Sequence, residues 1–325
     1  MPTREIIIVT PTLAAANNGN WRTARRWARF LSGHYRVRLA DRWVHGDEAA
    51  LIALHARKSA ASVATWRAAH PHRPLMLVLT GTDLYGDIAR DPAAQRSLAL
   101  ADRLVVLNEL GTLQLPADVQ DKTAICLQSS STRRTLDKPS RHLRALMVGH
   151  LREEKSPATY FEAARRVAQR PDILLDHIGG ALDAGLAQQA RELALHCPRY
   201  RWLGDLPHAD TRARIQAAHV LVHPSRIEGG AQAVIEAITS GTPVLASRIG
   251  GNLGLLGADY PGCFAWNDAS GLATLLQRAR DDTKFLAELR ASCAQRAPLF
   301  HPERERHTLL TLLASLLEDA RRVAA

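Results

Sequence analysis

Two glutamates eight residues apart, Glu228 and Glu236, flank a turn that could bind an anion. Gly229 and Gly230 follow the first glutamate directly, between a strand-like run and a helical stretch. Such a turn would direct backbone N–H groups and the positive end of a helix at an anion. The carboxylates could then accept hydrogen bonds from hydroxyls, so the pattern predicts a nucleotide sugar as the ligand. The alternative is an acidic helix start that only complements the helix dipole, with Glu236 an ordinary solvated residue.

A second candidate segment, residues 149–155, follows a strand-like run and opens a helix. Its cations Arg152 and Lys155 are three residues apart, so they can converge on one group. Two cations beside a diphosphate would stabilise the charge that grows on a departing nucleotide. The alternative is a mixed-charge helix start, in which these cations only pair with Glu153 and Glu154.

Polar residues also gather just after the strand-like runs of the first half. In parallel sheets these positions share the edge at which α/β proteins bind ligands. A glycine turn with amide side chains suits a phosphate or sugar, although an ordinary capped loop is the alternative. A single His or Asp at a strand end is often structural. The expected acceptor group comprises Asn17, Asn18, Gly19, Asn20, His55, Arg57, Lys58, Thr80 and Asp83.

The elements that must position these residues follow from the apolar pattern. Short, continuous apolar runs alternate with helical stretches, which is typical of parallel strands covered on both faces. A polar, basic stretch at 129–144 separates two such series, and leucines at helical spacing follow Pro302. We expect an α/β fold of two doubly wound, Rossmann-like domains that face each other across a cleft. Their predicted limits are 1–138 for the acceptor domain, 139–300 for the donor domain and 301–325 for a terminal helix that packs on the first domain.

The net charge of the chain limits the classes of partner that it is expected to bind. The formal net charge is +10, which suits a nucleic acid, an anionic membrane surface or small anionic substrates. Nucleic acid is the least favoured, because no motif interleaves basic and aromatic residues. The stripe of Arg22, Arg25, Arg26 and Arg29 predicts a solvated helix face, with membrane contact or substrate steering as the alternatives.

Several other classes of protein are disfavoured. No apolar run approaches the roughly 18–20 residues of a membrane span, and the first residues do not resemble a signal peptide. The four cysteines are scattered without a CxxC pair, which favours reduced thiols in the cytoplasm. The chain also lacks the DxD, HExxH, GxSxG and P-loop motifs. We therefore expect no metal ion and no cofactor, with Arg152, Lys155 and backbone N–H groups neutralising the diphosphate.

With these residues in view, the second half resembles the family 4 glycosyltransferases of GT-B fold. The resemblance is carried by Met147-Val148-Gly149, Arg152, Lys155, Glu228-x7-Glu236 and Gly241-Thr242-Pro243-Val244. The first half matches more loosely, since Thr80 stands where the family usually has histidine and Asn108 where serine often occurs.

The resemblance implies a role for each donor-side residue. Arg152 and Lys155 would hold the diphosphate, and Glu236 would accept the ribose hydroxyls. Glu228 would lie near the sugar hydroxyls, so Arg152, Lys155 and Glu228 are the candidate catalytic residues. The implied donor site comprises Gly149, Arg152, Lys155, Glu228, Gly229, Gly230, Ala231 and Glu236.

Nearly the whole chain also resembles a narrower group, the selenosugar synthases of selenoneine biosynthesis. Long strings carry this likeness, among them ANNGNWRTARRWARFL, MVGHLREEKSP and HPSRIEGGAQAVIEA. It implies transfer of a glycosyl group from a UDP-sugar to the selenium of selenophosphate, with release of UDP and phosphate. A selenium anion is a soft nucleophile that needs no strong base, which fits the absence of an evident His–Asp pair. The alternatives are a hydroxyl or lipid acceptor, a nucleotide-sugar epimerase, or a nucleotide-sugar sensor without catalysis.

Overall fold

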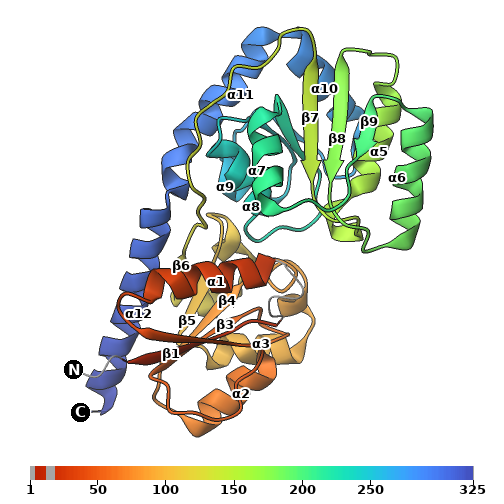
Figure 1. The fold of residues 1–325 in the computed structure, drawn as a ribbon. Coiled ribbons are helices and arrows are strands. Elements are labelled where there is room, and N and C mark those ends of the chain that lie inside the picture. The colour runs from red at the N-terminus through yellow and green to blue at the C-terminus, as the bar shows by residue number, and fades with distance from the viewer. Residues whose placement is uncertain (1–3, 12–18, 325) are drawn as a thin grey trace. The chain divides into compact units, whose positions relative to one another are not determined.

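The computed structural model describes residues 4–11 and 19–324 and divides the chain into two compact units (Figure 1). By their contacts, unit 1 comprises Met1–Ser129, Glu228–Gly230 and Pro302–Ala325, and unit 2 comprises Ser130–Ile227 and Ala231–His301. Each unit is built on a six-stranded parallel sheet. The expected α/β architecture of two parallel-sheet, Rossmann-like domains and a C-terminal helix is therefore confirmed.

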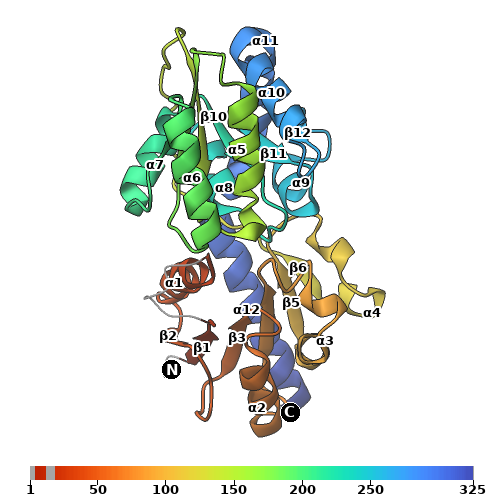
Figure 2. The same ribbon diagram turned by 90° about the vertical axis from the view of Figure 1, so that its right-hand side faces the viewer.

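The sheet of unit 1 has the strand order β2-β1-β3-β4-β5-β6. All its strands are parallel, and the order in which successive strands are added to the sheet reverses between β1 and β3. Its strands are β1 (Glu5–Val9), β2 (Arg36–Ala40), β3 (Ala50–Leu54), β4 (Leu75–Leu79), β5 (Arg103–Val106) and β6 (Thr123–Ile125). The helical elements are α1 (Gly19–Leu31), α2 (Ala60–Ala69), η2 (Asp87–Ala89), α3 (Pro92–Leu100), η3 (Gly111–Gln114), α4 (Ala117–Gln120) and α12 (Pro302–Ala324). Helices α1 and α12 lie on one face of this sheet and α2 and α3 on the other (Figure 2).

The continuous apolar runs of unit 1 follow from this two-sided cover. Successive strand residues point to opposite faces. Ile7 and Leu51 therefore pack in the core beneath α2 and α3, whereas Ile6 and Ile52 pack beneath α1 and α12. Since both faces are buried, every position of such a strand is apolar, as the sequence pattern predicted.

The sheet of unit 2 has the order β12-β11-β10-β7-β8-β9, with its reversal at β10 and β7. Its strands are β7 (Leu143–Val148), β8 (Ile173–Ile178), β9 (Tyr200–Trp202), β10 (Val220–His223), β11 (Val244–Ser247) and β12 (Cys263–Phe264). The helical elements are η4 (Glu153–Lys155), α5 (Pro157–Arg166), α6 (Ala184–His196), α7 (His208–Ala217), α8 (Gln232–Ile238), α9 (Gly250–Leu256), α10 (Ala269–Asp281), α11 (Thr283–Arg296) and η5 (Ala297–Phe300). Ligands of such sheets bind at the carboxyl ends of the strands near the reversal, which here are the ends of β7 and β10.

Helix α12 is anchored to unit 1 through a buried carboxylate. Glu305 is 1% exposed and accepts hydrogen bonds from Arg26 Nε at 2.9 Å, Trp27 Nε1 at 2.7 Å and Ser129 N at 2.8 Å. Arg26 is therefore not part of the solvated stripe that was expected on α1, because its side chain is paired with the buried carboxylate of Glu305. Within the described residues, no helix combines the length and apolarity that a membrane crossing requires.

Candidate active site

The loop after β7 in unit 2 is held by a buried histidine that the sequence analysis missed. His177 Nε2 lies 3.0 Å from the carbonyl oxygen of Gly149, and its Nδ1 lies 3.1 Å from Tyr200 Oη. A carbonyl can only accept, so Nε2 carries the proton and Nδ1 accepts from the tyrosine. Burial lowers the pKa of His177 to about 4, so the ring is neutral at pH 7. The backbones also approach closely, because a β-carbon at Gly179 would lie 1.9 Å from the Gly149 oxygen.

The two predicted cations lie on this loop. The side chain of Arg152 is 44% exposed, and its Nε lies 3.9 Å from Glu154 Oε2. Lys155 lies alongside Gly149, where an added β-carbon would meet Lys155 Cδ at 3.4 Å. Glu153 pairs with a different cation, Arg226, at 3.2 Å. The ion pair of Arg152 is therefore long, and Arg152 is exposed enough to meet an anionic ligand.

Glu236 is a buried carboxylate in unit 2 rather than a solvated helix residue. It is 3% exposed, and its Oε1 lies 2.7 Å from Nε2 of His208, the first residue of α7. Burial lowers the pKa of the nearby Arg212 guanidinium, and the Glu236 charge opposes that shift. Among the described residues Oε2 has no hydrogen-bond partner, so one oxygen can accept from a hydroxyl. His208 was missed, because only tertiary structure brings it to Glu236.

The Glu228–Gly230 segment belongs to unit 1 by its contacts. The carbonyl of Gly229 accepts a hydrogen bond from Asn108 Nδ2 at 2.8 Å, and a β-carbon at Gly229 would lie 2.3 Å from the oxygen of Thr80. At Gly230 an added β-carbon would lie 2.7 Å from Gln128 Oε1. Close backbone packing therefore requires Gly229 independently of any ligand, whereas Gly230 is crowded only by side chains. Glu228 is 8% exposed, so it too is no ordinary solvated residue.

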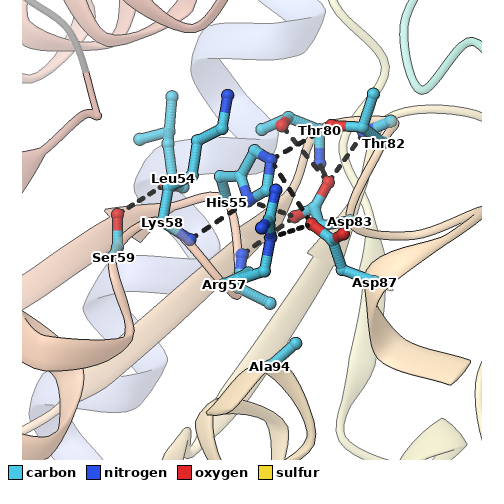
Figure 3. Close-up of polar contacts among 12 residues, drawn as sticks. Leu54, His55, Arg57, Lys58, Ser59, Thr80, Thr82, Asp83, Asp87 and Ala94 are labelled. Carbon is cyan, nitrogen blue, oxygen red and sulfur yellow. Dashed lines mark hydrogen bonds and ion pairs between the residues drawn. The ribbon is translucent and has the colours of Figure 1, made fainter. Parts of the chain in front are cut away.

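His55 lies among Arg57, Lys58, Thr80 and Asp83 of the expected acceptor group (Figure 3). It follows β3 at a φ of 75°, is 1% exposed, and its Nε2 lies 3.1 Å from Thr82 Oγ1. Its Nδ1 accepts from the backbone N–H of Lys58 at 3.4 Å and lies 3.9 Å from Asp83, while Nε2 lies 3.8 Å from Asp87. Burial lowers the pKa of His55, and the neighbouring aspartates oppose that shift. The sequence showed no evident His–Asp pair, because Asp83 and Asp87 approach His55 only in the fold.

Asp83 organises this cluster through the backbone. It is fully buried, and Oδ1 accepts from the N–H groups of Thr80 and Gly81 at 2.9 Å each, while Oδ2 accepts from Ala56 N at 2.9 Å. Its carboxylate thereby ties together the segments that follow β3 and β4. Lys58 is exposed beside this cluster, so it can meet a ligand directly.

Arg57 is the second exposed cation of the group, and its Nε donates to Asp87 at 2.9 Å. Gly19 and Asn20 form the first turn of α1, where the Gly19 carbonyl accepts from Thr23 Oγ1 at 2.9 Å. Asn17 and Asn18 lie outside the described residues. In the described part of the chain, no three His, Cys, Asp or Glu residues group in a way that could hold a metal ion.

Comparison with known proteins supports a glycosyltransferase scaffold. The family model "Glycosyl transferases group 1" matches residues 128–300. A D-inositol 3-phosphate glycosyltransferase of Corynebacterium kroppenstedtii is 30% identical over 250 residues, covering 67% of this chain and 55% of that protein. An Escherichia coli UDP-Gal:alpha-D-GlcNAc-diphosphoundecaprenol alpha-1,3-galactosyltransferase is 30% identical over 155 residues, covering 45% of this chain and 38% of that protein. The chain thus spans only 38–55% of the length of these two curated relatives.

Solved structures agree on the fold. The sucrose-phosphate synthase of Thermosynechococcus elongatus matches with a TM-score of 0.77 and 16% identity, covering 97% of this chain and all (100%) of that one. Anabaena HepE in complex with UDP and glucose matches with a TM-score of 0.74 and 16% identity, covering 96% and 100% of the two chains. These likenesses confirm the expected GT-B fold. Because the family model covers more than half of its residues, the chain belongs to the group 1 glycosyl transferases.

Proposed function

We propose that this protein transfers a glycosyl group from a UDP-sugar to the selenium of selenophosphate and so forms a 1-selenosugar. Membership of the group 1 glycosyl transferases supports glycosyl transfer, and the solved complex of Anabaena HepE with UDP supports a uridine nucleotide as the donor. The resemblance of the long sequence strings to selenosugar synthases supports the selenium acceptor.

On the donor side, the proposal assigns the ribose hydroxyls to the open oxygen of Glu236. His208 fixes the other oxygen at 2.7 Å and so holds the carboxylate in one orientation. Arg152 and Lys155 would stabilise the diphosphate as it departs, through charge that matters more in the transition state than in the bound substrate. Glu228 would lie beside the sugar hydroxyls, with Gly149, Gly229, Gly230 and Ala231 shaping the rest of the site.

One observation on the acceptor side carries the choice of a selenium nucleophile. The Nδ1 lone pair of His55 is used by the Lys58 N–H, and Nε2 carries the proton beside Thr82. This imidazole is therefore poorly placed to remove a proton from a sugar hydroxyl. A selenium anion needs no such base, and the exposed cations Arg57 and Lys58 suit its phosphate group.

The proposed reaction has two bond exchanges. Selenium forms a bond to the anomeric carbon as the bond from that carbon to the UDP oxygen breaks, and UDP leaves with the electron pair. Water then attacks phosphorus, the phosphorus–selenium bond breaks, and phosphate and the selenosugar are released. No metal ion takes part in this scheme.

A second candidate acceptor follows from the relatives, which include D-inositol 3-phosphate glycosyltransferases. Such an acceptor also carries a phosphate, which Arg57 and Lys58 would equally attract. It differs because its hydroxyl must lose a proton, a task for which His55 would have to change its hydrogen bonds.

The decisive experiment presents both acceptors to the purified full chain. UDP-glucose or UDP-N-acetylglucosamine is incubated with selenophosphate, with D-inositol 3-phosphate, or with neither, and the products are analysed by mass spectrometry. We expect a sugar with the isotope pattern of selenium, together with stoichiometric UDP. UDP release with selenium-free products would overturn the selenium acceptor, and a glycosylated inositol phosphate would establish the alternative.

A variant series then tests the donor site. Lys155→Ala should lower kcat sharply without loss of fold, measured by circular dichroism. Arg165→Ala is the matched control, because Arg165 is an exposed cation of unit 2 that pairs with Glu162. Equal activity of the two variants would exclude Lys155 from the chemistry.

A further inference from the structure

Unit 1 has a pocket at the edge of its sheet opposite to His55. Its volume is about 330 Å³, and Arg4, Ala49 and Pro74 line it. These residues directly precede β1, β3 and β4, whereas Thr10, His55 and Thr80 directly follow the same strands. Leu317, Ala320 and Arg321 of α12 also line the pocket. A five-residue strand spans roughly 17 Å, so a ligand in this pocket would not touch the acceptor group.

The pocket is rich in unneutralised positive charge. Arg4, Arg73 and Arg321 are among the residues that line it, together with His72. Its acidic lining residue is Asp47, which pairs with Arg73 at 2.5 Å but is 92% exposed, so water screens that pair. Within the described part of the chain, Arg4 and Arg321 have no carboxylate partner.

The three arginines come from separate elements, which distinguishes the pocket from an ordinary charged helix face. Arg321 alone would complement the negative end of the α12 dipole. Arg4, however, precedes β1, and Arg73 lies before β4, where its Nη1 donates to the carbonyl of Glu48 at 3.0 Å. Several arginines around one pocket are a common means of binding phosphate.

The rest of the pocket is apolar. Ala49, Pro74, Leu317 and Ala320 line it, and Leu317 is 5% exposed. Its volume lies at the lower end of the range for small-molecule sites. The occupant should therefore combine an anionic group with a short apolar part.

We propose that this pocket binds a small phosphate monoester that carries an apolar substituent. The phosphate lies among Arg4, Arg73 and Arg321, and the substituent packs on Pro74 and Leu317. Binding ties the last turns of α12 to the amino ends of the central strands. The proposal does not depend on which acceptor the enzyme uses.

Titration of the full chain with n-butyl phosphate tests this site, followed by calorimetry and by hydrogen exchange of α12. UDP is present in excess to occupy the donor site, and ionic strength is held constant. We expect saturable binding and slower hydrogen exchange in the last turns of α12. The double variant Arg4→Gln with Arg321→Gln should bind n-butyl phosphate at least tenfold more weakly. Arg322→Gln is the matched control, because this neighbouring exposed arginine does not line the pocket. Its affinity should stay within twofold of the wild type.

Three results would overturn the proposal. One is the absence of detectable binding of n-butyl phosphate. Another is an equal loss of affinity for n-butyl phosphate in Arg321→Gln and Arg322→Gln, which would indicate diffuse charge attraction. The third is binding only to phosphatidylglycerol vesicles, which would identify a lipid surface instead of a soluble ester. Inorganic phosphate serves as a further probe, and we expect it to bind more weakly than the butyl ester because it lacks the apolar substituent. If the double variant is misfolded by circular dichroism, the single Arg321→Gln variant decides the outcome.

Discussion

Removal of the Glu305 carboxylate should destabilise unit 1 severely. This side chain is 1% exposed and accepts from Arg26 Nε at 2.9 Å, Trp27 Nε1 at 2.7 Å and Ser129 N at 2.8 Å. The Glu305→Ala variant leaves all three donors without this acceptor. Arg26 is only 13% exposed, so water compensates poorly for the lost ion pair.

The magnitude follows from this burial. Loss of one partner of a buried, hydrogen-bonded ion pair costs about 3–5 kcal/mol. For a unit of this size, each kcal/mol lowers Tm by about 2–4 °C, so the expected decrease is roughly 6–20 °C. Glu305→Gln keeps an acceptor but loses the charge, so its decrease should be smaller.

Calorimetry measures the change in Tm of Glu305→Ala, and urea unfolding measures the change in its free energy of unfolding. Glu303→Ala is the control, since Glu303 lies two residues earlier on α12, is 69% exposed and pairs with the exposed Arg306. We expect that control to change the unfolding free energy by at most about 0.5 kcal/mol. A Glu305→Ala variant within about 1 kcal/mol of the wild type would refute the view that this carboxylate anchors α12.

Three further predictions concern the site and its pH dependence. Glu236→Gln should weaken UDP binding roughly 10–150-fold, because a hydrogen bond to a charged group contributes about 1.5–3 kcal/mol. His208→Asn should weaken UDP binding less. An unchanged affinity of Glu236→Gln for UDP, measured by calorimetry, would contradict the assignment of Glu236 to the ribose. Arg152→Ala should lower kcat roughly 30–1,000-fold with the fold intact, and an unaltered kcat in steady-state assays would exclude a role in leaving-group departure. Burial lowers the pKa of His177 and of His219 to about 4, below the unfolded value of about 6.5, so the unfolded state binds more protons and stability falls as pH drops between these values. Each histidine should lower the free energy of unfolding by up to about 2 kcal/mol at pH 5. If urea unfolding shows that His177→Gln loses as much stability in acid as the wild type, His177 is not a source of the acid sensitivity.

Much of the scaffold could be predicted from local sequence. A strand buried on both faces must be apolar at every position, so runs such as Leu75–Leu79 identified parallel strands before any contact was known. The spacing of leucines after Pro302 likewise predicted α12. Arg152 and Lys155 became candidate site residues because they are neighbours in the chain and follow a strand end.

Tertiary structure alone decided how these groups pair. His208 meets Glu236 across 28 residues, and Arg26 meets Glu305 across 279. Local periodicity shows which face of an element is apolar, but the partner of a polar side chain depends on how separate elements pack. Asp83 illustrates the same limit, because its residue type suggested a ligand contact, yet its carboxylate is used by backbone N–H groups. The sequence by itself determined the fold class and the candidate donor residues, whereas packing decided which charges are anchored and which remain open to a ligand.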